Sequence, residues 1–497
     1  LLLRAGDSVL PMQAPEHACS LASPVFAGKD AFVLLVGNTF KVVTLSGYGQ
    51  TFSLTSMPLP RTPKKIVRVP GRPLCAVLTS EQQSRKVSGK RPWDSSIELV
   101  DPISRKIVHS VHLGDRFGAF SLCTVPTGQQ GEGGGEEEEK SLLVVGGAVD
   151  ANVATRTGSK YALKVFRVLK NTVTLSYEVE TEYLPTFICL GAASGTIAVA
   201  MGSLLRLYDV SEKTMLRISD FSGFSTASPI SKISCMGNRL FVGHSTNFLT
   251  VLKINQGTNS MELLAADNSQ PSFVTALAAL SSNTVGGGDI FGNAFITTIP
   301  EWIEDGMGED GNGGGGNGEE ASSVVKAATT TSMHGGEESG AKDLLGLVGS
   351  ESSGKGEVTV RSHYYLGGAV VKMAPVNLGF RTQTVLLASS AHGTFSALFP
   401  LRTSEDITFM RQLEESVRQV WEHKQNLCNR SHRSYRSCYE PTKGTIDGDL
   451  CLLFTKLDKD DKEDVAKAIN DSLGGSTNAM TVKEVDRRIR AVVGAVL

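Results

Sequence analysis

The residues best suited to chemistry gather between residues 427 and 454. Cys428, His432, Cys438 and Cys451 carry the side chains that zinc prefers, thiolate and imidazole. Three, five and twelve residues separate them in order, a spacing that matches no close-paired zinc motif. Cys451 also falls inside an apolar helical pattern. The sequence therefore favours structural roles for these side chains, and we expect no metal site.

Two carboxylates in the same stretch, Asp447 and Asp449, could form an acid–base pair. Their context favours a helix start, because Asp447 can cap free backbone N–H groups and Asp449 suits the first-turn dipole. The apolar residues that follow occupy one helical face: Leu450, Leu453, Phe454 and Leu457. A cysteine nucleophile would also need a base and a third, orienting group. We therefore expect no catalytic residue here and no enzymatic activity.

Glycine-rich and turn residues elsewhere give no stronger chemical signal. Gly354-Lys355 is followed by Gly356, where a phosphate-binding loop needs Ser or Thr, so no cofactor is expected. His244 and His392 fall in hairpin turns, and we expect both to face solvent. Asp289 follows three glycines and is expected to serve a turn.

A basic and aromatic patch lies between residues 430 and 443. Arginine and tyrosine favour protein interfaces, and the same residues can also contact RNA phosphates and bases. Few cations lie here and the net charge of the chain is -2, so protein docking is favoured. Direct nucleic-acid binding remains the alternative. The expected docking and structural seam consists of Arg430, Arg433, Tyr435, Arg436, Tyr439, Lys443, Asp447 and Asp449.

The elements before this stretch form paired short strands. Seven hairpins are predicted: 32–36 with 40–45, 97–100 with 106–113, 142–145 with 161–169, 197–201 with 204–210, 240–243 with 248–254, 284–288 with 294–299, and 385–389 with 394–398. Their spacing is roughly 40 to 55 residues from the third to the sixth, typical of a β-propeller. We predict a mainly β protein with a seven-bladed, WD40-like propeller over residues 1–400. No Trp-Asp dipeptide ends the blades, and a β-sandwich or several unrelated β domains remains the alternative.

Two segments are too rich in glycine and glutamate to form a core. Residues 128–140 and 304–357 are predicted to be disordered insertions in the propeller. After residue 400 the pattern changes to helices, with a possible capping box at Thr403 and Asp406. Further helices are predicted over 449–457 and 462–473 and from Thr481. Residues 401–497 are therefore predicted to be a small C-terminal helical domain.

The totals of the chain limit other functions. It has 497 residues and eight cysteines without a close-spaced framework, which fits a reducing compartment. No apolar run approaches the ~18 residues of a membrane span, so no membrane partner is expected. The chain begins at Leu1, and we expect an N-terminal part of a longer polypeptide to be missing.

Several motifs resemble one family. Ile446-Asp447-Gly448-Asp449-Leu450 follows the Arg- and Tyr-bearing loop and precedes helices. This arrangement resembles the C-terminal region of the triple β-propeller scaffolds of splicing factor 3B, of the UV-damaged-DNA-binding protein and of the cleavage and polyadenylation specificity factor. The residues of these motifs are most similar to those of the splicing factor 3B branch of this family. Agreeing motifs are 61–65 (RTPKK), 205–209 (LRLYD), 286–293 (GGGDIFGN) and 403–406 (TSED).

The resemblance implies a nuclear scaffold of the U2 small nuclear ribonucleoprotein that supports branch-site recognition in pre-mRNA splicing. Implied partners are the other splicing factor 3B subunits, namely the helical-repeat large subunit and small companion subunits. Two N-terminal propellers would lie in the same or another chain, and contact with pre-mRNA or U2 RNA would be indirect or weak. The alternative is an adaptor of a cullin ubiquitin ligase in a DNA-damage complex, or of the mRNA 3′-end cleavage and polyadenylation complex.

Overall fold

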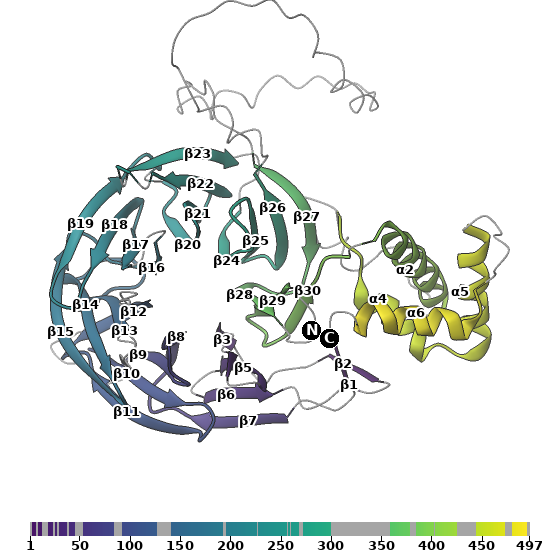
Figure 1. Cartoon of the computed structure of the whole chain (residues 1–497), viewed down its shortest axis with the longest axis horizontal. Helices are drawn as coiled ribbons and strands as arrows, with labels where there is room; N and C mark the ends of the chain where they lie inside the picture. Colours follow the sequence, from purple (N-terminus) through teal and green to yellow (C-terminus); the bar gives the residue numbers. More distant parts are fainter. Residues whose placement is uncertain are drawn as a thin grey trace, which may run out of the picture.

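A ring of β-sheets with helices beside it forms the protein (Figure 1). The computed structural model describes residues 53–83, 92–126, 141–191, 195–299 except 226, 256, 259 and 268–271, 358–377, 384–424 except 402, 444–472 and 480–494. Between residues 2 and 44 it gives strands and their pairing, and for positions 53–55 and 421–424, among others, it gives backbone only. The predicted insertions 128–140 and 304–357 lie outside the described residues.

Five consecutive sheets have four antiparallel strands each, in simple chain order. They are β8 (Pro63–Arg68), β9 (Cys75–Gln82), β10 (Trp93–Asp101) and β11 (Lys106–His112); β12 (Phe117–Pro126), β13 (Ser141–Val149), β14 (Lys160–Leu169) and β15 (Thr172–Thr181); β16 (Phe187–Leu190), β17 (Thr196–Met201), β18 (Leu204–Val210) and β19 (Met215–Phe221); β20 (Ile230–Met236), β21 (Arg239–His244), β22 (Leu249–Ile254) and β23 (Met261–Asp267); β24 (Val274–Ala279), β25 (Thr284–Asp289), β26 (Asn293–Thr298) and β27 (Thr359–Tyr365). A sixth sheet has three strands: β28 (Val370–Asn377), β29 (Thr384–Ser390) and β30 (Phe395–Leu398).

These six sheets are the blades of a propeller. The first strand of each sheet contacts the first strand of the next, so that these strands line the centre of the ring (Figure 1). The prediction of a mainly β propeller is confirmed. The structure shows six blades rather than seven, so the predicted number of blades is not confirmed.

The predicted and observed numbers of blades differ at the N-terminus, where strands β1–β7 are described by their backbone pairing. Two of these strands pair with each other, and the others form one sheet: β1 (Leu2–Ala5) with β2 (Ser8–Pro11), and β3 (Ala18–Ala22), β4 (Val25–Phe26), β5 (Lys29–Val36), β6 (Thr39–Thr44) and β7 (Ser53–Pro58). In this sheet β5 pairs with β6, as the first predicted hairpin requires. The other six predicted hairpins also pair as expected.

The core of the ring lies between neighbouring sheets. Strand β13 is buried along nearly its whole length, as expected for a strand covered on both faces. Outer strands such as β15 alternate and are mostly exposed. Apolar clusters join β8–β11 to β12–β15 and β24–β27 to β28–β30. Gly286 in β25 permits such contact, because a Cβ there would lie 2.4 Å from a methyl group of Leu386.

A β-bulge recurs near the start of the first strand in several blades. The pairing register shifts between Pro63 and Lys65 in β8, between Ile230 and Lys232 in β20, and between Val370 and Lys372 in β28. β12 and β24 carry the same shift. A bulge adds one residue and changes which side chains face each side of a sheet. Bulged residues also join the blades, since Ser231 donates through Oγ to the Val274 carbonyl at 2.5 Å.

The helices after the last strand form their own apolar cluster. They are α2 (Ser404–Lys424), α4 (Gly448–Leu453), the 3-10 turn η1 (Phe454–Lys456), α5 (Lys459–Ser472) and α6 (Val482–Gly494). Their shared core includes Leu413, Cys451, Ile469 and Val485. Thr403 caps α2, because the Asp406 N–H donates to Thr403 Oγ1 at 3.1 Å, which is one of the two bonds of the predicted capping box. None of the described helices is both long and apolar enough to span a bilayer.

Candidate functional site

The predicted docking seam is only partly within the described residues. Its basic and aromatic members lie outside them: Arg430, Arg433, Tyr435, Arg436, Tyr439 and Lys443. The two acidic members, Asp447 and Asp449, start α4. Asp447 is buried and accepts a hydrogen bond from the Leu450 N–H at 3.2 Å through Oδ1. The predicted helix cap is therefore confirmed at Asp447, and Asp449 lies in the first turn.

Residues just before this cap tie the helices to a blade. The Ser362 hydroxyl of β27 donates to the Gly444 carbonyl at 3.2 Å. The Thr445 hydroxyl donates to the His363 carbonyl, also at 3.2 Å. Gly444 has φ +60°, and a Cβ there would lie 2.4 Å from the Arg361 carbonyl oxygen. Residues 444–445 therefore run against the outer strand β27, and glycine is required for this close approach.

Cys451 confirms the structural interpretation of the cysteines as far as the description extends. Its thiol is buried in α4 and donates to the Met410 carbonyl at 3.6 Å. Burial raises the pKa of this thiol well above its ordinary value, so it is not a ready thiolate ligand. Cys428, His432 and Cys438 lie outside the described residues. Within the described part, no cluster of three or more His, Cys, Asp or Glu side chains could hold a metal ion.

Of the predicted turn residues, His244 departs from expectation. It ends β21 and is buried rather than solvent-facing, with its ring against Phe224. Its Nε2 lies 3.0 Å from Thr250 Oγ1, so a polar partner satisfies the buried ring. Phe224 belongs to the loop between β19 and β20, so the pattern of the turn that contains His244 did not reveal this burial. His392 is exposed, and Asp289 accepts from the Phe291 N–H at 2.9 Å in its turn.

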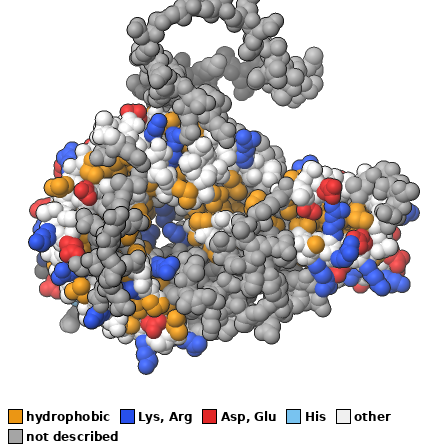
Figure 2. Space-filling model, viewed as in Figure 1, with side chains coloured by type: hydrophobic (Ala, Val, Ile, Leu, Met, Phe, Trp, Pro, Cys, Tyr) orange, Lys and Arg blue, Asp and Glu red, His pale blue; other side chains and the backbone are white. Residues whose placement is uncertain are grey.

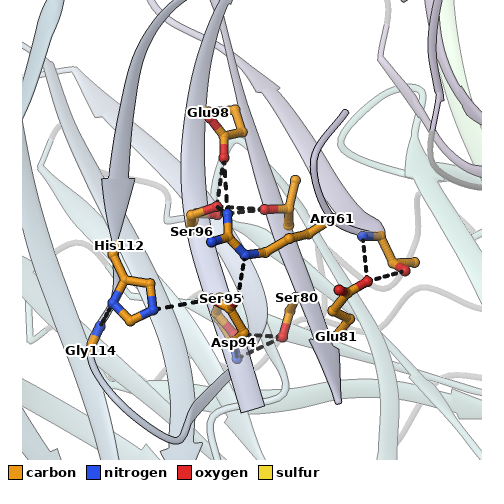
Figure 3. A network of polar contacts seen from close by, with 12 residues as sticks. Arg61, Ser80, Glu81, Asp94, Ser95, Ser96, Glu98, His112 and Gly114 are labelled. Atoms are coloured by element: carbon orange, nitrogen blue, oxygen red, sulfur yellow. Dashed lines mark hydrogen bonds and ion pairs between the residues drawn. The ribbon is translucent and has the colours of Figure 1, made fainter. Parts of the chain in front are cut away.

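A polar network within the blade β8–β11 contains the residue types of a hydrolase site (Figure 3). Arg61 Nε lies 2.8 Å from Asp94 Oδ2, and Arg61 Nη1 lies 3.7 Å from the buried Glu98. The Ser96 hydroxyl donates to Glu98 Oε1 at 2.6 Å. His112 Nε2 lies 3.1 Å from Asp94 Oδ1. The network thus brings a cation, two carboxylates, a serine and a histidine together.

The geometry of this network excludes a serine–histidine–aspartate triad. Such a triad needs one imidazole nitrogen on the carboxylate and the other on the serine hydroxyl. Here His112 Nδ1 instead accepts from the Gly114 N–H at 3.2 Å. Ser80 and Ser95 bond each other at 2.7 Å. Ser80 Oγ also accepts from the Ala119 N–H of the next blade at 3.3 Å. The network therefore stabilises the blade and its contact with β12.

A second group of charges lies at the centre of the ring. Lys65, Lys232 and Lys372 occupy the position directly after the bulge in three first strands, β8, β20 and β28. Each is half-buried. The space-filling view shows a hollow near the middle of the ring with blue Lys or Arg side chains inside it (Figure 2). Equivalent positions in β12 and β24 hold small residues, Ser121 and Ala276.

Lys65 and Lys232 lie against the same aromatic ring, and the pKa of all three lysines is lowered. Lys65 Nζ and Lys232 Nζ lie 5.7 Å and 5.0 Å from the centroid of the Phe187 ring. Burial, followed by the charge of Lys372, lowers the pKa of Lys65 to about 8. Burial and both other lysines lower the pKa of Lys232 well below its ordinary value. Burial also lowers the pKa of Lys372.

Two thiols, and no carboxylate of the described residues, lie near Lys372. Lys372 is influenced by Cys123 and Cys189, and no carboxylate of the described residues contributes to the pKa of any of the three. Burial raises the pKa of Cys123 to about 12 and that of Cys189 well above its ordinary value. The thiols are therefore neutral at pH 7 and do not balance the ammonium charges.

The sequence interpretation missed this lysine cluster. Each lysine stands in a short alternating strand, where a polar residue usually faces solvent. A signal did exist: each lysine is the third residue of its strand, in PKK of β8, ISK of β20 and VVK of β28. Aligning the strands on the repeat would have placed the three lysines at one position.

Comparisons with known proteins show which proteins this chain is similar to. Residues 94–456 match the family model described as the CPSF A subunit region. Probable splicing factor 3B subunit 3 of Dictyostelium discoideum is 27% identical over 370 residues, covering 74% of this chain and 26% of that protein. Pre-mRNA-splicing factor prp12 of Schizosaccharomyces pombe is 25% identical over 502 residues, covering 97% of this chain and 37% of that protein.

A third relative, pre-mRNA-splicing factor RSE1 of Mycosarcoma maydis, is 24% identical over 478 residues. That match covers 89% of this chain and 36% of the relative. The chain thus spans between a quarter and two fifths of the length of the curated relatives it matches. The resemblance drawn from the sequence motifs is confirmed by these matches.

Proposed function

The chain belongs to the family of the CPSF A subunit region, and from this membership we propose that it is a non-enzymatic scaffold in pre-mRNA splicing. The observation that carries the proposal is the run of relatives named as splicing factors, which match most of this chain. The geometry agrees, because the serine, histidine and carboxylates of the described blade bond one another in a structural network.

In this proposal the chain is the scaffold part of a splicing factor 3B complex within the U2 small nuclear ribonucleoprotein, in the nucleus. It supports branch-site recognition through protein contacts with a helical-repeat large subunit and small companion subunits. The propeller comprises residues 1–400, and the helical domain comprises residues 401–497. The sheet of β3–β7 acts as the seventh blade; its strand β3 contacts both β28 and β8.

The seam formed by Arg430, Arg433, Tyr435, Arg436, Tyr439, Lys443, Asp447 and Asp449 is the proposed docking element. Support comes from its described end, where Gly444 and Thr445 bond β27 and Asp447 caps α4. Both ends of the segment that carries the basic residues are therefore held, by α2 on one side and by β27 on the other. A segment held at both ends loses less conformational entropy on binding a partner.

Purification of the endogenous, tagged protein tests the function. We expect splicing factor 3B subunits and U2 RNA among the associated components. Recovery of cullin or cleavage-factor subunits without the U2 particle would contradict the proposal and favour an adaptor function instead.

A second purification tests the seam within that function. Arg433→Glu with Arg436→Glu should reduce recovery of the protein subunits at least tenfold while the melting temperature stays unchanged. Lys467→Glu with Lys483→Glu, two exposed changes on α5 and α6 with the same total change of charge, is the matched control and should leave recovery unchanged. If the seam variant loses only RNA and keeps the protein subunits, the seam is a nucleic-acid contact and the docking role is wrong.

A further inference from the structure

The lysine cluster at the centre of the ring, namely Lys65, Lys232 and Lys372, lacks a carboxylate partner among the described residues. Half-buried ammonium groups that face one another cost stability, through lost hydration and through like-charge repulsion. Elsewhere in the same ring, Arg61 and Arg206 have carboxylate partners, at 2.8 Å and 2.7 Å. A costly charge cluster without such partners among the described residues is typical of a binding site.

The repeated structure of the blades sets the position of the cluster. The same bulge precedes each lysine, so the three side chains project from equivalent points of β8, β20 and β28. These strands line the centre of the ring (Figure 1). Phe187 of β16 lies within 5.7 Å of two of the ammonium groups and gives them a common wall. One small ligand can therefore contact Lys65 and Lys232 together.

The side chains around the cluster favour a ligand with several negative charges. The nearby thiols of Cys123 and Cys189 are neutral, and the three lysine side chains, when all are protonated, offer up to nine N–H donors. A phosphate group suits them, because it carries up to two negative charges and its tetrahedral oxygens accept from several directions at once. A planar carboxylate carries one charge and satisfies fewer of these donors.

We propose that the central channel of the propeller binds a small, multiply charged phosphate compound between Lys65, Lys232 and Lys372. The ligand neutralises the cluster and stabilises the three blades that supply it. This inference is independent of the splicing role, because it rests on the channel and not on the seam or on the relatives.

Isothermal titration calorimetry of the full chain with sodium tripolyphosphate, at low ionic strength, tests the proposal. We expect saturable binding of one tripolyphosphate per chain, and weaker binding of inorganic phosphate. Ligand that binds only the folded state also raises the melting temperature. An absence of saturable binding, or tighter binding of an octaglutamate peptide than of tripolyphosphate, would overturn the proposal.

Variants locate the site. Lys232→Gln should weaken tripolyphosphate binding at least tenfold, and the triple change of Lys65, Lys232 and Lys372 to Gln should abolish it. These variants should fold, since each removes like-charge repulsion. Lys213→Gln, in an exposed turn, is the matched control and should bind as the parent does. If Lys213→Gln weakens binding as much as Lys232→Gln, the phosphate binds the surface and the channel site is wrong.

Discussion

Two groups of half-buried charge in the same ring are arranged in opposite ways. In the Arg61 network, which comprises Arg61, Asp94, Ser96, Glu98 and His112, cations, carboxylates and hydroxyls alternate (Figure 3). In the lysine cluster, three lysines gather at the centre of the ring, burial lowers the pKa of each, and no carboxylate of the described residues contributes. The first arrangement satisfies its charges internally. The second leaves its charge available to something that enters the channel, so burial alone does not distinguish structural from binding charges.

Removing Arg61 should cause the largest loss of stability. Arg61→Ala leaves Glu98 buried beside Ser96 without its cation, and breaking such a pair costs about 3 kcal/mol or more. The urea midpoint should fall accordingly. The double variant Arg61→Ala with Glu98→Gln should recover part of the loss, because the remaining side chain is neutral. If both variants unfold like the parent, the network does not stabilise the blade.

A hydroxyl within the same network should matter less. Ser96→Ala removes the donor to Glu98 at 2.6 Å and should cost about 1 to 3 kcal/mol in unfolding free energy. The exposed hydroxyl of Thr155, in the loop between β13 and β14, gives a control, and Thr155→Ala should stay within about 0.5 kcal/mol of the parent. Equal costs for the two changes would mean that burial of the network adds nothing.

Removing a lysine from the cluster should raise the stability, whereas the two changes in the Arg61 network should lower it. Lys232→Met keeps the apolar stem against Phe187 and removes a repelled charge, so the melting temperature without ligand should rise by a few degrees. The stabilisation by tripolyphosphate should shrink in the same variant. A lower melting temperature would show that Lys232 has a stabilising partner and would break the contrast with the Arg61 network.

The smallest expected effect is the change of stability with pH that Lys65 causes. The pKa of Lys65 falls from 10.5 when exposed to about 8 in the folded chain, through burial and the charge of Lys372, although a hydrogen bond with Lys232 opposes the fall. Between these values the unfolded chain binds more protons, so stability should increase as pH rises from about 8 to 10.5. In Lys65→Met this increase should be smaller. A stability that is flat or falling over this range in the parent, after correction by the variant, would contradict the assigned environment of Lys65.

Sequence patterns were sufficient for the hairpins of the ring and for the helix cap at Asp447. Turn residues such as Gly202-Ser203 fixed the hairpins, and the helical stripe that contains Leu413 and Val417 predicted α2. Asp447 was assigned as a cap because a carboxylate before a helix bonds locally, within three residues. Features that depend on residues close in sequence were therefore predictable.

Features that depend on the assembled ring were not. Lys65, Lys232 and Lys372 are separated by more than a hundred residues each, and only closure of the ring brings them together. His244 was expected in solvent because its own turn is polar, whereas the neighbouring Phe224 covers it. The number of blades also depends on closure, because the N-terminal strands must meet the last sheet.

The strand order has a consequence for how the chain folds during synthesis. Each four-stranded sheet uses consecutive strands, so its contacts are local and can form soon after its residues leave the ribosome. The contact of β3 with β28 joins residues about 350 positions apart and must wait for the last sheet. The faces of the two end sheets stay uncovered throughout that interval and offer apolar side chains to other chains. Synthesis slowed late in the message should therefore increase aggregation of the nascent chain more than the same delay placed early.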